Sequence, residues 1–270
     1  MEGLETRDIA KVGVSGITRE QDNVTSEEGL SISVATNAHG TQNIGVTMRS
    51  KGEDRSLVIG FLYSEGIINS MDDIISIDED SDGITALFGE DSAFDPNIHC
   101  RSGTVTSACG ICGRSTIDDT EHIHGPELDE NTRVTIEGIG KCLEEMKTSQ
   151  ILFSRTGGSH ACASFNSEFE ILRIFEDVGR HNAMDKLVGS YVSDGNTPQS
   201  EVLFVSGRAS FELVQKCLRI GFPIMISIGG PSTLAVDLAK EHGLTLGCFA
   251  RSDSLTVYSG VRRVNHKKSL

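Results

Sequence analysis

Residues 201–250 decide the fold, because short apolar runs alternate there with amphipathic segments. EVLFVSG (201–207), PIMISIG (223–229) and LTLGCFA (244–250) are typical of strands that are buried on both faces. SFELVQKCLRI (210–220) and STLAVDLAKEH (232–242) lie between them and carry the helical period. Strand, helix, strand, helix, strand at this spacing predicts right-handed crossovers and a largely parallel sheet.

Residues at the ends of the two expected helices support the same interpretation. Ser210 and Ser232 precede them as N-cap residues, and Gly221 and Gly243 follow them as C-terminal stops. LTVYS (255–259) predicts one further strand.

Upstream, the most linker-like stretch is HIHGPELDENT (122–132), and a helical pattern, IEGIGKCLEEMKTSQILF, begins at Ile136. We therefore expect an α/β domain over residues 127–270. Residues 27–126 predict a small α+β domain with a hairpin at 30–48, a helix at 57–68 and two short strands. Residues 1–26 are polar and predict a frayed arm or an edge strand.

Composition narrows the class of function. The chain has 270 residues, with 24 Lys and Arg against 39 Asp and Glu, which gives a net charge of −15. This charge argues against a partner that is a nucleic acid or an anionic membrane. No apolar run approaches the roughly 18 residues of a membrane helix, and the first residues lack the pattern of a signal peptide. We therefore expect a cytoplasmic protein.

The expected strand ends carry residues suited to an anionic ligand. Ser206 to Arg208 follow the first strand, Gly229 to Ser232 the second, and Phe249 to Asp253 the third. Parallel strands bind ligands beyond their carboxyl ends, where helix N-termini and arginines attract phosphates. The pattern predicts a phosphorylated or nucleotide ligand, while ordinary tight turns with solvated arginines remain the alternative.

Cys109 and Cys112, in CGICG (109–113), are the residues most suggestive of chemistry. Two thiols three positions apart can form a disulfide, hold a metal or relay sulfur, and structural cysteines are the fourth possibility. His122 and His124 fit no standard zinc spacing, and the polar sequence after Cys112 does not resemble the helix of a dithiol oxidoreductase. The other cysteines lie in or beside apolar runs, which predicts packing roles; they are Cys100, Cys142, Cys162, Cys217 and Cys248.

A second group of ionisable residues lies in TGGSHA (156–161) and EDVGRHNAMDK (176–186). The latter enters a helical pattern that places His181 and Asp185 one turn apart on one face. Such a pair can serve as acid and base, or it can be a buried, hydrogen-bonded His–Asp pair that only holds the helix to the sheet.

Together, CGICG, TGGSHA, EDVGRHNAMDK, SGRASFELVQK (206–216) and LTLGCFARSDSLTVYS (244–259) resemble the FdhD/NarQ family of formate dehydrogenase accessory sulfurtransferases. The resemblance extends from about residue 60 to residue 259. It implies a C-terminal domain with the three-layer α/β fold of cytidine deaminases. Deaminase chemistry is not expected, because the His-x-Glu and Pro-Cys-x-x-Cys signatures are missing from the sequence.

The resemblance also implies an activity and its partners. The protein would accept persulfide sulfur from a cysteine desulfurase and pass it to the molybdenum cofactor, Mo-bis-molybdopterin guanine dinucleotide, before that cofactor enters the catalytic subunit of formate dehydrogenase. Cys109 would carry the persulfide, with Cys112 as its partner. No permanently bound metal is expected, and the resemblance favours a homodimer.

The cofactor-binding residues implied by the resemblance and by the strand ends can be named. They are Phe249, Ala250, Arg251, Ser252, Asp253 and Ser254, together with Ser206, Arg208 and His181. Two rival functions remain: a zinc-stabilised nucleotide-binding module without sulfur transfer, and a nucleotide-dependent dithiol oxidoreductase, for which no GxGxxG motif follows a strand.

Overall fold

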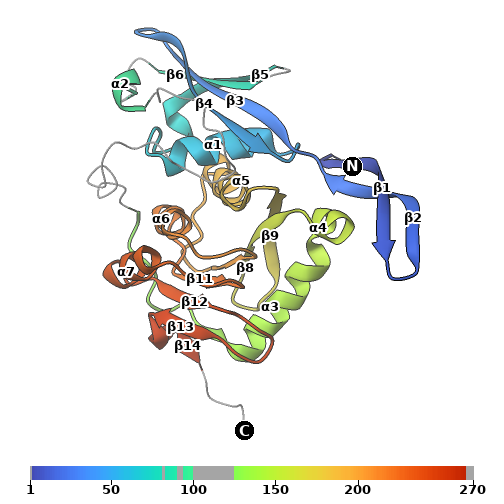
Figure 1. Cartoon of the computed structure of the whole chain (residues 1–270). Coiled ribbons are helices and arrows are strands. Elements are labelled where there is room, and N and C mark those ends of the chain that lie inside the picture. The colour runs from blue at the N-terminus through green and yellow to red at the C-terminus, as the bar shows by residue number, and fades with distance from the viewer. Residues whose placement is uncertain (1, 81–82, 90–93, 100–124, 266–270) are drawn as a thin grey trace.

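The computed structural model describes the chain except residues 1, 81–82, 90–93, 100–124 and 266–270 and the side chains of residues 97 and 98 (Figure 1). The helices it describes are α1 (Asp54–Ser64), α2 (Pro96–His99), α3 (Ile136–Ser149), α4 (Ile151–Thr156), α5 (Arg180–Ser193), α6 (Phe211–Ile220) and α7 (Thr233–Glu241). Short 3-10 turns occupy Met71–Asp73 and Val261–Arg263.

A six-stranded sheet forms the centre of the C-terminal part. Its strands are β8 (His160–Phe165), β9 (Ile171–Asp177), β10 (Val202–Val205), β11 (Ile224–Ser227), β12 (Thr245–Cys248) and β13 (Thr256–Ser259). They lie in the order β13-β12-β11-β10-β8-β9. The predicted alternation is confirmed, because β10, β11 and β12 run parallel and are joined through α6 and α7.

The expectation of a largely parallel sheet is wrong for the sheet as a whole. β8 pairs antiparallel with both β9 and β10, and β13 pairs antiparallel with β12. The connections from β8 to β9 and from β12 to β13 carry no crossover helix. Short connections of this kind join antiparallel strands, whereas parallel strands need a long crossover.

The caps of the two predicted helices are also as expected. Gly221 ends α6 in the left-handed conformation with φ +99°, and the Ser232 side chain accepts a hydrogen bond from the Ala235 amide at the start of α7. Ser210 is the N-cap residue of α6, although its side chain makes no capping bond to that helix.

The N-terminal part contains a four-stranded sheet that is covered by α1. Its strands are β3 (Glu28–Thr36), β4 (Gly40–Arg49), β5 (Ile74–Glu79) and β6 (Gly83–Phe88), in the order β4-β3-β6-β5. The predicted hairpin is β3–β4, and its alternation places Leu30, Ile32 and Val34 in the core. The helix predicted from residue 57 begins three residues earlier, at Asp54, and ends at Ser64.

Two smaller pairs of strands complete the fold. β7 (Val134–Thr135) and β14 (Val264–Asn265) pair in parallel. β1 (Leu4–Gly13) and β2 (Gly16–Thr25) turn the polar N-terminal arm into an antiparallel hairpin that stands off from the rest of the molecule (Figure 1).

The two parts meet where α1 crosses α5 with almost no side chain between the backbones. A Cβ atom on Gly60 of α1 would lie 1.8 Å from the Asp185 carbonyl oxygen, and one on Gly189 of α5 would lie 1.8 Å from the Ser56 carbonyl oxygen. One hydrophobic cluster runs through this crossing and takes buried residues from both parts, for example Leu57 and Leu187. The glycines therefore allow the two parts to share a core.

In the described ranges of the chain, no helix has the length and apolar character needed to cross a bilayer.

Candidate functional site

The loops that follow β10, β11 and β12 lie together at one edge of the six-stranded sheet. We call residues 206–209, 229–232 and 249–254 the strand-end platform. The Gly229 amide donates to the Gly207 carbonyl oxygen at 3.1 Å, and the Phe249 amide donates to the Gly229 carbonyl oxygen at 3.1 Å. Residues 209 and 231 form a parallel bridge. The three segments that the sequence placed at strand ends are therefore one hydrogen-bonded surface.

Two glycines allow these loops to approach so closely. A Cβ on Gly229 would lie 2.9 Å from both the Arg208 Cα and the Gly207 carbonyl oxygen. A Cβ on Gly230 would lie 2.6 Å from the Phe249 ring, which therefore lies across the bare backbone of Gly230. Any larger residue at either position would push the loops apart.

Phe249 has a left-handed backbone with φ +53°, which is uncommon for a residue with a bulky side chain. Hydrogen bonds on both sides hold it there, since the Ala250 amide also donates to the Ser227 carbonyl oxygen at 3.1 Å. The result is an aromatic ring that is 46% exposed beside Ala250, which is 2% exposed. Strain of this kind persists where the surrounding structure over-determines the conformation, and it is common at ligand sites.

Residues 251–254 form a turn that is fixed at both ends. The Arg251 amide donates to the Ser254 carbonyl oxygen at 2.9 Å, and the Arg251 guanidinium donates to the Ala250 carbonyl oxygen at 2.7 Å. The Ser252 carbonyl oxygen lies 2.7 Å from where a Cβ on Gly140 of α3 would be. Ser252, Asp253 and Ser254 are exposed, so their side-chain oxygens face solvent.

Arg208 is the cation best placed to bind an anion on this platform. Its side chain is exposed and has no hydrogen-bond or ion-pair partner among the described residues. Ser206, by contrast, uses its hydroxyl to accept the Ala161 amide at 2.9 Å. Several backbone amides of the platform are bonded within it, so an anion there would be held chiefly by side chains such as Arg208 and Ser252, and less by free amides.

His181 lies beneath the platform and is 2% exposed. Its Nε2 lies 2.7 Å from the Glu212 carboxylate and 3.3 Å from the Ser210 hydroxyl. The hydrogen bond from His181 lowers the pKa of Glu212, which therefore stays ionised near neutrality. Because serine and carboxylate share one ring nitrogen, these residues do not form a catalytic triad, which needs the carboxylate on the other nitrogen.

Asp185 lies one helical turn after His181, as predicted, but it bonds to other partners. It forms a buried ion pair with Lys216 of α6 and accepts a hydrogen bond from the Ser64 hydroxyl of α1 at 3.0 Å. His181 and Asp185 thus connect α5 to its neighbours separately. The contact to Ser64 links the two parts of the molecule.

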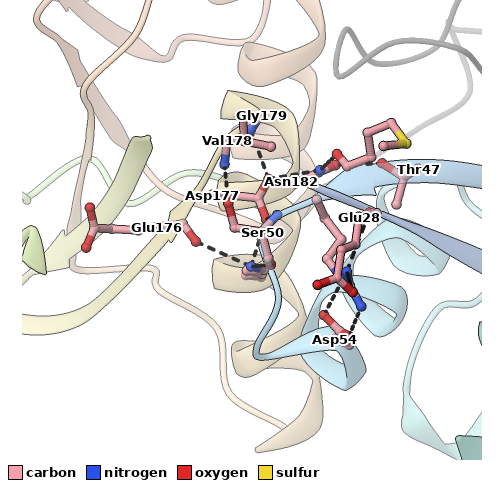
Figure 2. A network of polar contacts seen from close by, with 12 residues as sticks. Glu28, Thr47, Ser50, Asp54, Glu176, Asp177, Val178, Gly179 and Asn182 are labelled. Carbon is pink, nitrogen blue, oxygen red and sulfur yellow. Dashed lines mark hydrogen bonds and ion pairs between the residues drawn. The ribbon is translucent and has the colours of Figure 1, made fainter. Parts of the chain in front are cut away.

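Asp177 is the centre of a buried network that joins the end of β4 to the start of α5 (Figure 2). Its carboxylate accepts the amides of Ser50 at 3.1 Å and Gly179 at 2.9 Å, and it pairs with Lys186 at 2.7 Å. The Asn182 side-chain amide donates to the same carboxylate at 3.0 Å. Burial raises the pKa of Asp177, although the Lys186 ammonium acts in the opposite direction.

These contacts explain much of the EDVGRHNAMDK motif. Lys186 also donates to the Ser50 carbonyl oxygen at 2.9 Å, and Asn182 donates to the Met48 carbonyl oxygen at 2.8 Å. Several of its polar residues therefore hold the N-terminal sheet to α5. Sequence reasoning missed Ser50, and its only signal was a small polar residue directly after a strand.

His160, the last polar residue of TGGSHA, lies under Gly207 of the platform. A Cβ on Gly207 would be 3.4 Å from His160 Nδ1 and 3.3 Å from the Arg180 Cδ. Burial lowers the pKa of His160, and the neighbouring Arg180 and His181 lower it further. An imidazole in this setting is neutral at physiological pH.

The described cysteines are sealed in the interior as free thiols, as predicted; they are Cys142, Cys162, Cys217 and Cys248. Burial raises the pKa of Cys142 and of Cys248 to about 12, and it raises the pKa of Cys162 and of Cys217 further. Thiols in this state carry almost no thiolate and are poor nucleophiles.

Cys109 and Cys112 lie outside the described residues, as do Cys100, His122 and His124. In the part of the chain that is described, no three His, Cys, Asp or Glu side chains come together so that they could hold a metal ion.

Comparison with known proteins identifies relatives over nearly the whole chain. The model of the FdhD/NarQ family matches residues 26–265. A protein of Thermoplasma acidophilum named sulfur carrier protein FdhD is 40% identical over 267 residues, which cover 96% of this chain and 93% of that protein. Proteins with the same name from Streptomyces avermitilis and Sulfurisphaera tokodaii are 37% and 39% identical, covering 96% and 91% of this chain and 95% and 92% of their own lengths.

A solved structure shares the fold. It is the crystal structure of a protein from Desulfotalea psychrophila assigned as a formate dehydrogenase accessory protein, with a TM-score of 0.79 and 23% identity. The similarity covers 97% of this chain and 100% of that one.

Proposed function

The chain belongs to the FdhD/NarQ family, and from that premise we propose that it is a sulfur carrier in the maturation of formate dehydrogenase. In this proposal Cys109 accepts sulfur as a persulfide from a cysteine desulfurase. The sulfur then passes to the molybdenum cofactor, Mo-bis-molybdopterin guanine dinucleotide, which is a bound substrate and not a resident group. The receiving enzyme is the catalytic subunit of formate dehydrogenase.

The burial and protonation of the four described cysteines support the assignment of Cys109 as the sulfur acceptor. A persulfide carrier needs a thiol that ionises near neutral pH and that a partner protein can reach. Cys142, Cys162, Cys217 and Cys248 meet neither condition, because they are buried and their pKa values are raised. Sulfur chemistry therefore falls to the remaining cysteines of the sequence, and of these only Cys109 and Cys112 form a Cys-x-x-Cys pair.

The loading step balances without any added oxidant. The Cys109 thiolate attacks the terminal sulfur of the donor persulfide, so that a new sulfur–sulfur bond forms at Cys109 while the bond within the donor breaks. The donor leaves as a thiolate, and the terminal sulfur brings its proton along to Cys109. Cys112 is the neighbouring thiol that can release the sulfur if it is not passed on: attack of its thiolate on the inner sulfur of the Cys109 persulfide forms a Cys109–Cys112 disulfide, breaks the persulfide bond and expels the terminal sulfur as hydrosulfide.

The strand-end platform supports the proposed binding of the cofactor. The guanine dinucleotide moieties of the cofactor carry phosphates, which are matched by the exposed guanidinium of Arg208 and by the hydroxyl of Ser252, while the Ser254 hydroxyl donates to the Asp253 carboxylate at 3.1 Å. The exposed Phe249 ring offers a flat apolar surface for stacking a heterocycle. His181 would act only indirectly in this arrangement, by fixing Ser210 and Glu212 at the start of α6.

Chain length is compatible with delivery of sulfur to the platform. Gly125 packs against α6 near its C-terminal end, where a Cβ would lie 2.0 Å from the Leu218 carbonyl oxygen. α6 is ten residues long, or about 15 Å, and its first residue follows the platform. The covalent chain from Gly125 back to Cys112 can extend to roughly 43 Å. The chain between Gly125 and Cys112 is therefore long enough for the cysteine to reach the platform.

Intact-protein mass spectrometry tests the assignment. The protein is incubated with cysteine and a cysteine desulfurase, and its mass is recorded before and after treatment with a thiol reductant. We expect a gain of one sulfur atom that the reductant removes. Cys109→Ala should abolish the gain, and Cys142→Ala is the matched control that should leave it intact, because Cys142 is buried and protonated.

Two results would contradict the proposal. A Cys109→Ala variant that still gains reducible sulfur would remove Cys109 from the pathway. A wild-type chain that gains no sulfur and binds zinc stoichiometrically would instead favour the zinc-stabilised binding module.

A further inference from the structure

The His160 imidazole is a half-buried polar group whose backbone is fixed on both sides. Directly before it, the Ser159 hydroxyl donates to the Glu176 carboxylate at 2.8 Å. Directly after it, the Ala161 amide donates to the Ser206 hydroxyl at 2.9 Å. The ring itself makes no hydrogen bond or ion pair among the described residues. Because neither ring nitrogen is sealed from solvent, both can reach a ligand.

The polar side chains around His160 are used differently. His181 bonds to Glu212, and Asp177 pairs with Lys186, so these groups satisfy one another inside the fold. Buried polar groups that serve only the fold are paired in this way. A rigidly held side chain whose hydrogen-bonding capacity is unused can bind a ligand with little loss of conformational freedom, and this indicates that His160 has a role in binding.

His160 lies against the strand-end platform. A Cβ on Gly207 would be 3.4 Å from His160 Nδ1, so the ring occupies the space beside the bare backbone of this glycine. Arg208 is the next residue, and consecutive Cα atoms are about 3.8 Å apart. Its exposed guanidinium has no partner among the described residues. An anion that Arg208 binds can therefore contact the imidazole as well.

The charges around the ring favour an anionic ligand. The charged and titratable groups that face it from the surrounding elements are Arg180 and His181 of α5, Asp177 of β9, Arg208 of the platform and, beyond His181, Glu212 of α6. Burial lowers the pKa of His160, Arg180 and His181 lower it further, and Asp177 acts in the opposite direction. The ring is therefore neutral near neutral pH while no ligand is bound. A bound anion favours its protonated form.

We propose that His160 is a further binding residue of the strand-end platform, and that its imidazole takes up a proton from solvent when a diphosphate diester binds at Arg208. The imidazolium then donates a hydrogen bond to a phosphate oxygen, and no covalent bond of the ligand changes. This inference rests on the proposed function, because the diphosphate is that of the cofactor. Proton uptake makes the affinity rise as the pH falls through the pKa of His160 in the complex, and the affinity levels off below the pKa of the free protein.

Isothermal titration calorimetry with the full chain tests this linkage. The probe is GDP-mannose, because its diphosphate diester has no proton to gain or lose near neutral pH. We expect the wild-type affinity to rise about tenfold between about pH 8 and about pH 5.5, which corresponds to a change of about one unit in the pKa of the ring. His160→Gln keeps a hydrogen-bond donor but does not titrate, so its profile should be flat. His39→Gln is the matched control: His39 is exposed at the turn between β3 and β4, and the wild-type profile should persist.

A measurement on the wild type does not depend on how the variants fold. The His160 ring resonances are assigned by NMR and titrated with and without GDP-mannose, and the midpoint should move to higher pH when the probe is bound. A midpoint that does not move, or a pH profile that His160→Gln shares with the wild type, would overturn this inference alone. A wild type that binds no GDP-mannose at any pH would overturn it together with the role of the platform in the proposed function. The mass measurement of sulfur loading tests the carrier role separately.

Discussion

Gly60→Ala should destabilise the protein even though alanine is the better helix former. The substitution removes a glycine from the interior of α1, which by helix propensity alone would stabilise the fold by about 1 kcal/mol. At this position, however, the added Cβ would lie 1.8 Å from the Asp185 carbonyl oxygen and 2.7 Å from the Gly189 amide nitrogen. Carbon and oxygen atoms in contact need more than 3 Å, so α1 and α5 must move apart by over 1 Å.

That movement would disturb several contacts at once. The Ser64 hydroxyl would be pulled from Asp185, and the cluster between the two parts, which includes Leu57 and Leu187, would loosen. Overpacking a core costs about 1–3 kcal/mol and at times more. The clash is with backbone atoms that cannot swing aside, so we take the upper end of this range, about 3 kcal/mol. Subtracting the gain in propensity of about 1 kcal/mol leaves a net loss of about 2 kcal/mol, which for a chain of this size lowers the melting temperature by roughly 4–8 °C.

Differential scanning calorimetry measures this shift directly. Arg55→Ala is the matched control, because Arg55 lies on the same helix and is exposed, and its melting temperature should change little. Gly189→Ala should behave like Gly60→Ala, and the double variant should lose less than the sum, because the helices separate once for both. A Gly60→Ala protein that melts at or above the wild-type temperature would refute the close backbone crossing.

Three further predictions concern the buried network, the platform and the titration of a histidine. Lys186→Met should lower the free energy of unfolding by about 3–5 kcal/mol because it leaves Asp177 as an unpaired buried charge, and adding Asp177→Leu should recover part of this loss; chemical denaturation measures both. Arg208→Ala should weaken binding of guanosine diphosphate at least about tenfold by calorimetry and leave the melting temperature unchanged, since Arg208 has no partner among the described residues; equal affinity would remove it from the site. The pKa of His160 is lowered in the folded state, so the unfolded state binds more protons as the pH falls through 6.5, and the melting temperature should drop more steeply there in the wild type than in His160→Gln; parallel curves would contradict this.

Local patterns were enough to predict the centre of the C-terminal part. Apolar runs bounded by Ser210, Gly221, Ser232 and Gly243 define the β10–α6–β11–α7–β12 unit, because caps and periodicity are encoded by neighbouring residues. The convergence of Arg208, Gly229 and Phe249 at one edge follows from parallel strand order alone. That part of the candidate site could be located from the sequence.

Contacts between distant segments could not be predicted in the same way. In the sequence, Gly60 and Gly189 are glycines inside helical patterns, where they would be expected only to weaken a helix. The structure shows that each lies against the backbone of the other helix, where a Cβ atom would not fit. β8, β9 and β13 join the sheet as antiparallel strands because the connections from β8 to β9 and from β12 to β13 are short. Hydrophobic periodicity identifies a strand but does not give its direction in the sheet. The polar residues around Asp177 suggested chemistry, yet they hold two parts of the fold together.

The N-terminal arm was predicted least well. Its alternating charges carry no apolar period, so the sequence indicated only an arm or an edge strand. The hairpin forms because Gly13 and Gly16 bracket a two-residue turn, with φ +126° at Gly16.

The position of α5 has a consequence for synthesis of the chain on the ribosome. This helix is buried at 11 of its 14 positions, between α1 on one side and the six-stranded sheet on the other. When α1 is complete, the helix that will pack against it begins more than 110 residues later in the sequence. The face of α1 that contains Ser56 and Gly60 must therefore wait uncovered until α5 has been made. Packing of α1 against a helix so distant in sequence slows folding. Until then the nascent N-terminal half exposes apolar surface, which chaperones bind.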